Sequence, residues 1–303
     1  MRGSEIRVLQ ALEEGRTVSE LAEHLDLSKS YISELVSDLE KQRLVYTRKE
    51  GKNKLVSASE HQFIERLQHL DREFPHIGFS ELLTRKTFAV LYYLDEKRTV
   101  SEIADLTGEY RNTVNRVVGK LTERGITGKD GAEYQLNNQF RELHELAQEY
   151  VTHRHRLDTP ASSFSIAWED LDRFLVETDK EIDGSQFTET GPQRFQDFGI
   201  PLFDTSTNHY IYTKTDYELT VPELISHTLL IDSGTRHQTF CLLLLEKHGP
   251  AKDSVLESAE RYGTEKQVER LYEYLDSKDE QNPVDLPRWD DFTDTAADYG
   301  IQI

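Results

Sequence analysis

Apolar side chains in the first half of the chain recur with the spacing of helices that bury one face. Between residues 29 and 42 they follow the positions i, i+3, i+4 and i+7, at Ile32, Leu35, Val36 and Leu39. A shorter apolar stripe predicts a helix over residues 5–14. Thr17 and Glu20 predict a capping box that opens a helix through residue 25, because each side chain can bond the backbone N–H of the other.

The pattern then changes to that of a β-hairpin, and the whole series is repeated further along the chain. Residues 44–59 form two β-prone runs joined by a turn, LVYTRKEGKNKLVSAS. At an offset of 82 residues, segment 8–44 aligns with segment 90–126 without a gap, and both contain the block Arg-Thr-Val-Ser-Glu. Residues 126–136 add a second hairpin with an Asp-Gly turn, ITGKDGAEYQL. The first half of the chain therefore consists of two copies of one unit.

Helix, tight turn, helix and hairpin is the layout of a winged helix-turn-helix. The two copies, TVSELAEHLDLSKSYISELVSDLEKQRLV and TVSEIADLTGEYRNTVNRVVGKLTERGI, resemble prokaryotic transcription regulators of the MarR and ArsR kind. The resemblance covers about residues 4–136, and it implies binding to double-stranded DNA through the third helix of each copy, which would enter the major groove.

The charge of the chain is distributed unevenly. The net charge is −20, but residues 1–58 carry equal numbers of acidic and basic side chains, and residues 82–130 carry nine basic against seven acidic. Residues 160–303 carry twelve basic against twenty-nine acidic side chains. The acidity lies in the second half, so the first half can approach a phosphate backbone. A surface this acidic resembles that of proteins from salt-loving archaea, and an acidic mesophilic protein is the alternative.

With the apolar stripes turned inward, the third helix of each copy exposes polar side chains near its N-terminal end. In the first copy the candidate DNA contacts are Ser28, Lys29, Ser30, Tyr31 and Ser33. In the second they are Tyr110, Arg111, Asn112, Thr113, Asn115 and Arg116. Arg and Asn can make paired hydrogen bonds to guanine and adenine, so the second copy is the better equipped to read bases. Glu34 would repel phosphates near the first helix.

The two hairpins also differ in their basic residues, but here the first copy is the better equipped. The first wing carries four basic residues, Arg48, Lys49, Lys52 and Lys54, whereas the second offers mainly Lys129. We therefore expect a division of labour, in which the first wing grips phosphates and the second recognition helix reads sequence. The alternative for either copy is a docking or dimer module that binds no DNA.

The expected fold class is α+β, with two tandem winged helix-turn-helix domains before a mixed α/β domain. The expected divisions are residues 1–58, a linker helix at 59–81, residues 82–136, a connecting helix at 137–158, an acidic effector or interaction domain at 159–280, and a polar tail at 281–303. Helix 137–157 carries an apolar stripe and is the candidate contact of a homodimer. The alternative is that this helix packs against its own second winged domain.

The acidic half faintly resembles the C-terminal domain of abortive-infection antitoxins, which have a nucleotidyltransferase-like fold. Gly184-Ser185 fits that resemblance, but no pair of acids spaced one residue apart follows on a strand, so we expect no nucleotide transfer. Asp232 with Glu246 and Lys247 has the wrong spacing for a metal-dependent nuclease. His227 and His237 could line a pocket or be structural. We expect no enzyme activity, cofactor or metal, and a protein or small-molecule effector could bind this domain.

The remaining features restrict location and function. No apolar run is long enough for a membrane span, residues 1–15 lack the apolar core of a signal peptide, and the single Cys241 permits no internal disulfide. We expect a cytoplasmic protein without membrane contact. The predicted function is sequence-specific DNA-binding transcription regulation, and the alternative is an antitoxin-like or partner-binding protein whose C-terminal domain engages another protein. A third class is an enzyme that the winged domains target to DNA.

Overall fold

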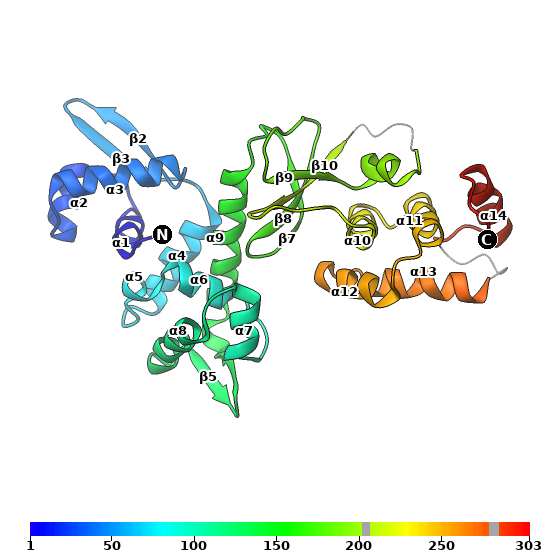
Figure 1. Cartoon of the computed structure of the whole chain (residues 1–303). Helices are drawn as coiled ribbons and strands as arrows, with labels where there is room; N and C mark the ends of the chain where they lie inside the picture. Colours follow the sequence, from blue (N-terminus) through cyan, green and yellow to red (C-terminus); the bar gives the residue numbers. More distant parts are fainter. Residues whose placement is uncertain (202–206, 279–284) are drawn as a thin grey trace. The chain divides into compact units, whose positions relative to one another are not determined.

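The computed structural model describes residues 1–201, 207–278 and 285–303. The chain divides into two compact units, Met1–Asp158 and Thr159–Ile303 (Figure 1). Among the described residues, the first unit encloses one hydrophobic cluster and the second unit encloses three, the largest of them between its helices. Helices and small antiparallel sheets are combined in both, so the predicted α+β fold class is confirmed. No helix in the described part of the chain is long and apolar enough to cross a membrane.

The first unit begins with three helices and a three-stranded antiparallel sheet, here called the first repeat (residues 3–58). Its elements are α1 Gly3–Gln10, β1 Arg16–Thr17, α2 Val18–Leu25, α3 Lys29–Lys41, β2 Val45–Glu50 and β3 Asn53–Ala58. The strand order is β1-β3-β2. The predicted capping box is present, with the Thr17 hydroxyl accepting from Glu20 N and the Glu20 carboxylate accepting from Thr17 N. Helix α1 is shorter than expected, because the chain must leave it to bring β1 onto β3.

A second repeat (residues 85–136) has the same elements in the same order. They are α6 Arg85–Tyr92, β4 Arg98–Thr99, α7 Val100–Thr107, α8 Arg111–Glu123, β5 Thr127–Asp130 and β6 Glu133–Leu136. The strand order, β4-β6-β5, corresponds to that of the first repeat. The three helices and the first strand begin and end 82 residues after their counterparts, so the internal repeat seen in the sequence is a repeat of structure. Only the hairpin differs, since its strands are four residues long instead of six.

One further helix follows each hairpin, and these helices join the two repeats into one body. Helix α4, Gln62–Glu73, follows the first hairpin and leads through α5, Phe79–Leu82, to the second repeat. After the second hairpin come the short helix η1, Asn138–Phe140, and the long helix α9, Glu142–Asp158. Helix α9 packs against both α4 and α6.

The apolar stripe of α9 is buried inside the first unit. Leu143, Leu146 and Ala147 are inaccessible to solvent, and Tyr150 and Val151 are nearly so. The stripe is therefore not available as the dimer contact expected of helix 137–157. The alternative weighed for this helix, packing within its own chain, is the observed arrangement, and it extends to helices of both repeats.

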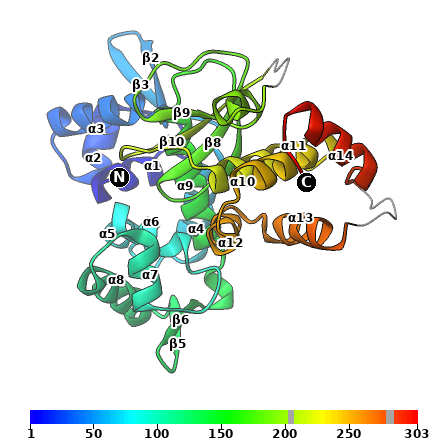
Figure 2. The same ribbon diagram turned by 45° about the vertical axis from the view of Figure 1, so that its right-hand side comes forward.

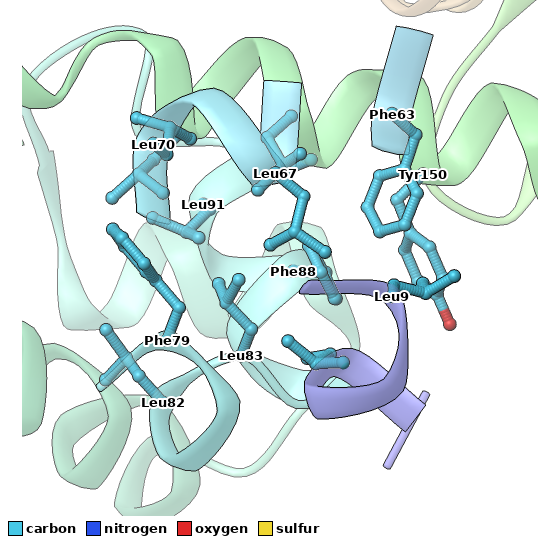
Figure 3. Close-up of a cluster of buried hydrophobic side chains, with 14 of the residues drawn as sticks. Leu9, Phe63, Leu67, Leu70, Phe79, Leu82, Leu83, Phe88, Leu91 and Tyr150 are labelled. Carbon is cyan, nitrogen blue, oxygen red and sulfur yellow. The ribbon is translucent and has the colours of Figure 1, made fainter. Parts of the chain in front are cut away.

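The core of the first unit is continuous from Ile6 to Tyr150. At its centre the ring centroids of Phe88 and Tyr150 lie 4.3 Å apart, and Phe63 lies 5.9 Å from Phe88 and 5.6 Å from Tyr150. Figure 3 shows these rings beside Leu9 of the first repeat and Leu91 of the second. The two repeats thus bury their apolar faces against shared side chains rather than in two separate cores.

The second unit consists of a four-stranded antiparallel sheet and a group of helices. The sheet contains β7 Ser165–Glu169, β8 Arg173–Thr178, β9 Phe187–Thr190 and β10 Asn208–Thr213, in the order β7-β8-β10-β9. The helices are η2 Pro192–Phe198, α10 Val221–Ile231, α11 Thr235–His248, α12 Lys252–Tyr262, α13 Glu265–Ser277 and α14 Trp289–Asp298. The most apolar run of this unit, residues 240–245, lies in α11.

Residues 170–172 turn the chain back on itself, so that β7 and β8 are antiparallel neighbours. Gly263, whose φ of +70° is left-handed, ends α12 and separates it from α13. The expectation of a polar tail was wrong, because that segment contains α14, whose Phe292 is fully buried in the core of the second unit. The expected boundary between residues 280 and 281 lies outside the described residues.

The two histidines considered for a pocket have structural partners. His227 is fully buried with Nδ1 2.7 Å from Thr190 Oγ1, and His237 Nδ1 lies 2.9 Å from the Asp232 carboxylate. Asp232 directly follows the last turn of α10, and Glu246 lies within α11. The strand geometry that a nuclease interpretation would need is therefore not formed by these residues.

We expect Phe88→Ala to weaken both repeats together, because its ring belongs to their common core. The loss should be about 3–5 kcal/mol, as for other large-to-small substitutions of buried aromatic residues. Native-state hydrogen exchange should show the same loss of protection in α3 and α8. Phe292→Ala, in the core of the second unit, is the control and should leave both helices protected. If α8 loses protection while α3 keeps it, the repeats are independent folding units.

A buried histidine pair predicts how the stability of the first unit depends on pH. His153 Nδ1 lies 3.0 Å from His61 Nε2, and His153 Nε2 lies 2.7 Å from the carbonyl oxygen of Gln42. Burial lowers the pKa of His153 to about 4, and the neighbouring His61 adds to this effect. The unfolded chain therefore binds a proton near pH 6.5 that the folded chain binds only near pH 4.

The free energy of unfolding should accordingly rise with pH between 4 and 6.5, by up to about 1.4 kcal/mol per pH unit from His153. Urea denaturation at pH 7 and pH 5 would measure the difference. His153→Gln keeps a hydrogen-bond donor and acceptor but cannot titrate, so it should reduce the difference, whereas His24→Gln on the exposed face of α2 should not. An unchanged difference in His153→Gln would contradict the assignment.

Candidate nucleic-acid interface

The N-terminal end of α3 is partly occupied by its own capping interactions. Ser28 is the N-cap, and its hydroxyl accepts from Tyr31 N at 3.3 Å. Tyr31 is half-buried with its hydroxyl 3.0 Å from Ser4 Oγ, and Ser33 Oγ donates to the carbonyl oxygen of Lys29. Ser30 Oγ lies 3.1 Å from Ser28 Oγ, so among the predicted contacts in this helix Lys29 is the exposed side chain outside these hydrogen bonds. The exposed carboxylate of Glu34 lies on the same helix.

The corresponding end of α8 is open and basic. Tyr110 is the N-cap residue, makes no side-chain capping bond and is 84% exposed. Thr113 is half-buried, and the other predicted side chains are exposed: Arg111, Asn112, Asn115 and Arg116. Within residues 1–201, 207–278 and 285–303, none of these four side chains has a hydrogen-bond or ion-pair partner. Their hydrogen-bond donors, and the acceptor oxygens of the two asparagines, are therefore available to an external ligand.

The first wing concentrates positive charge around the two-residue turn of the β2–β3 hairpin. Its basic side chains Arg48, Lys49, Lys52 and Lys54 are exposed. They line a shallow concavity of about 340 Å³ together with Thr47 and Asn53. Lys49 and Lys54 are direct cross-strand partners. Like charges opposite each other destabilise a hairpin, so this arrangement is favourable only when an anion lies close to both.

A carboxylate on α3 moderates this charge. Glu40 accepts a hydrogen bond from Thr47 Oγ1 at 2.7 Å and pairs with Lys54 Nζ at 3.4 Å. The hydrogen bond from Thr47 is the main cause that lowers the pKa of Glu40, and the charge of Lys54 acts in the same direction. Glu40 therefore connects the hairpin to α3 and would compete with an external anion for Lys54.

The second wing is shorter and its charges are internally compensated. Lys129 Nζ lies 5.4 Å from the centre of the Tyr134 ring, within range of a cation–π interaction. Asp130 pairs with Lys97 at 2.5 Å, and this pair lowers the pKa of Asp130. The hairpin also carries Glu133. This wing has a weaker attraction for phosphates than the first.

The candidate residues thus form one group in each repeat. The basic residues of the first wing and the polar face of α8, which the sequence proposed as DNA contacts, are exposed. Thr47, Asn53 and Glu40 lie beside the first wing and were not among those candidates. Strand alternation puts Thr47 and Asn53 on opposite faces of the hairpin, and Glu40 reaches the wing only through tertiary structure.

One group of side chains has the composition of a metal site. Ligand atoms of His69, Glu73 and Glu142 lie within 4.8 Å of one another. All three are at least partly exposed, and Glu142 is also 3.4 Å from the guanidinium of Arg66, which pairs with Glu145 and Glu149 as well. This group is best described as part of the ion-pair network between α4 and α9.

An accessible helix N-terminus beside a basic hairpin is the arrangement of a winged helix DNA-binding domain. Comparison with protein families gives the particular class: residues 1–54 match the MarR family. Residues 184–301 match a family defined as a C-terminal domain. Neither match spans half of the chain, and no curated protein matches it.

These comparisons confirm part of the sequence interpretation. The first repeat is a MarR-type winged helix, a domain of DNA-binding transcription regulators. The segment 184–301 forms most of the second unit, and its family match gives no support to the antitoxin resemblance. Neither family model reaches residues 85–136.

We expect Glu40→Gln to increase the affinity of the protein for any DNA duplex. The substitution removes a negative charge from the wing and frees Lys54, while the amide oxygen can still accept from Thr47. Because the ion pair is exposed, the gain should be about two- to fivefold. Fluorescence anisotropy with a short duplex of unrelated sequence would measure it.

The control is Glu269→Gln, which removes the same charge from an exposed position of α13 in the second unit. If both substitutions raise the affinity equally, the effect reflects net charge alone. If neither does, the first wing does not contact DNA.

Proposed function

We propose that the protein is a sequence-specific DNA-binding transcription regulator in which both repeats contact DNA with different roles. The second recognition helix, α8, reads base edges, and the first wing grips the phosphate backbone. The observation that carries this proposal is the contrast between the two repeats. Helix α8 presents four unpaired polar side chains beside a weak wing, whereas α3 uses part of its polar end for capping and lies beside a strongly basic wing.

The chemistry of α8 suits direct readout in the major groove. Arg111 and Asn115 are four residues apart, so they lie on the same side of the helix. Arginine forms paired hydrogen bonds with guanine, and asparagine with adenine. Arg116 and Asn112 flank this pair and are suited to neighbouring bases or phosphates. Lys129 and Tyr110 complete the proposed contacts of the second repeat.

The first repeat is suited to holding the duplex in place. Arg48, Lys49 and Lys52 have no internal partner in the part of the chain that the structure describes, and they line one concavity with Asn53. Such a surface attracts phosphates irrespective of sequence. Lys29 and Ser30 at the start of α3 would lie close to the same duplex.

We propose further that the second unit is a non-enzymatic regulatory domain, which binds a protein or small-molecule effector. Its own core and its sheet support an independent role. Its excess of acidic side chains makes contact with the duplex unfavourable. The strand after Gly184-Ser185, β9, has the sequence Phe-Thr-Glu-Thr, with one carboxylate rather than the pair used in nucleotidyl transfer.

Substitutions in the two repeats should therefore have different effects. The preferred duplex can be selected from a random library. Arg111→Ala and Asn115→Ala should each reduce the difference in binding free energy between that duplex and a random one by about 1–3 kcal/mol. Lys52→Ala should weaken binding to all duplexes alike and reduce the slope of log affinity against log salt by about one. Gel-shift titrations over a range of KCl concentrations, with a duplex selected from a random library, would separate these effects.

Ser33→Ala is the matched control, because Ser33 occupies the position in α3 that Asn115 occupies in α8. It should have a smaller effect on sequence preference than Asn115→Ala. The division of labour is wrong if Lys52→Ala changes preference and Asn115→Ala does not. If no duplex is bound above background, DNA binding itself is excluded.

A further inference from the structure

The structural repeat is longer than the sequence repeat. Each repeat consists of three helices and a hairpin, and each hairpin is followed by one long helix, α4 in the first case and α9 in the second. These are the two segments that the sequence assigned to different roles, as a linker and as a dimer contact. In the structure they are corresponding elements of two copies.

The corresponding helices pack against each other. Phe63 of α4 lies 5.6 Å from Tyr150 of α9, measured between ring centroids. Arg66 of α4 pairs with Glu145 at 2.6 Å and with Glu149 at 2.9 Å, both on α9. Contact between equivalent elements is the defining property of the interface in a two-fold symmetric dimer. Here the same kind of interface lies within one chain.

The segment that connects the repeats is held firmly in place. Helix α5 packs on α1, and a Cβ on Gly3 would collide with the backbone carbonyl oxygen of Ser80. In Figures 1 and 2 the hairpins β2–β3 and β5–β6 project from opposite ends of the first unit, each beside its own recognition helix. The shared core fixes the two recognition helices relative to each other, as a dimer interface does in a two-subunit regulator.

The exposed residues of the two recognition helices differ at corresponding positions. Lys29 corresponds to Arg111, Ser30 to Asn112, Ser33 to Asn115 and Glu34 to Arg116. In the last pair a negative side chain, Glu34, corresponds to a positive one, Arg116. Identical helices in a homodimer require identical half-sites, whereas unlike helices favour unlike ones.

We propose that a single chain contacts two unlike half-sites on one DNA duplex, in place of the two identical half-sites that a homodimer contacts. The proposal rests on the DNA-binding function proposed above and specifies its target: an asymmetric duplex site bound by one copy of the chain. The half-site under α8 is defined by base contacts. The half-site under α3 and the first wing is defined mainly by phosphate contacts and tolerates more sequences.

The test begins with selection of binding duplexes from a random library by the full chain. The enriched sequence should not be a palindrome, and mass photometry of the complex should give one chain per duplex. The protected region should extend over two half-sites whose centres lie about 10 base pairs apart, the spacing of adjacent major grooves on one side of the duplex.

Repeating the selection with substituted chains gives a sharper result. Asn115→Ala should relax the sequence on one side of the enriched site only, and Ser33→Ala, at the corresponding position, should leave that side unchanged. In a homodimer every substitution occurs twice, so both sides would relax together.

Four outcomes would overturn the proposal: an enriched palindrome, two chains per duplex, protection of a single half-site, or symmetric relaxation by Asn115→Ala. The first two leave DNA binding intact and contradict only the single-chain arrangement. If the library yields no enriched sequence and no duplex binds, the proposed function fails and the inference fails with it.

Discussion

The packing of Phe63, Phe88 and Tyr150 is the contact on which the first unit depends. These rings come from α6 of the second repeat and from α4 and α9, the helices that follow the two hairpins, yet they meet within 6 Å of one another. Neither repeat encloses its apolar surface without the other. The core therefore determines the relative placement of the two recognition helices before any ligand is present, and that placement is stabilised by burial rather than by a flexible connection.

The two repeats keep one set of residues similar and vary another. Facing the core, Ile32, Leu35, Val36 and Leu39 of α3 correspond to Val114, Val117, Val118 and Leu121 of α8. On the exposed face, the corresponding residues differ in size, hydrogen-bonding groups and charge. The same fold thus supports one helix whose start is capped by serine and another whose start is open and basic. The different roles proposed for the two repeats therefore rest on their exposed residues, while the residues that face the core are similar.

Much of the fold could be predicted where the signals are local. Thr17 with Glu20 and Thr99 with Glu102 form capping boxes from residues three apart, and the spacing of apolar residues in α3 and α8 states which face is buried. An apolar stripe predicts which face of a helix is buried but not which element packs against that face, so the role of α9 could not be derived from its sequence. For the same reason the exposed face of Arg111 and Asn115 was predictable, whereas the contact of Glu40 with the wing was not.

The joining of two unlike recognition helices in one chain changes what a substitution can do. In a homodimer a substitution is present in both subunits. If it costs about 1.4 kcal/mol of binding free energy at each half-site, it weakens binding about a hundredfold. When the helices are separate parts of one sequence, the same substitution acts once and costs about tenfold. Each half can then change in smaller steps while the other holds the duplex. A chain with two unlike DNA-binding repeats can therefore acquire a new target sequence through a series of variants that all still bind DNA.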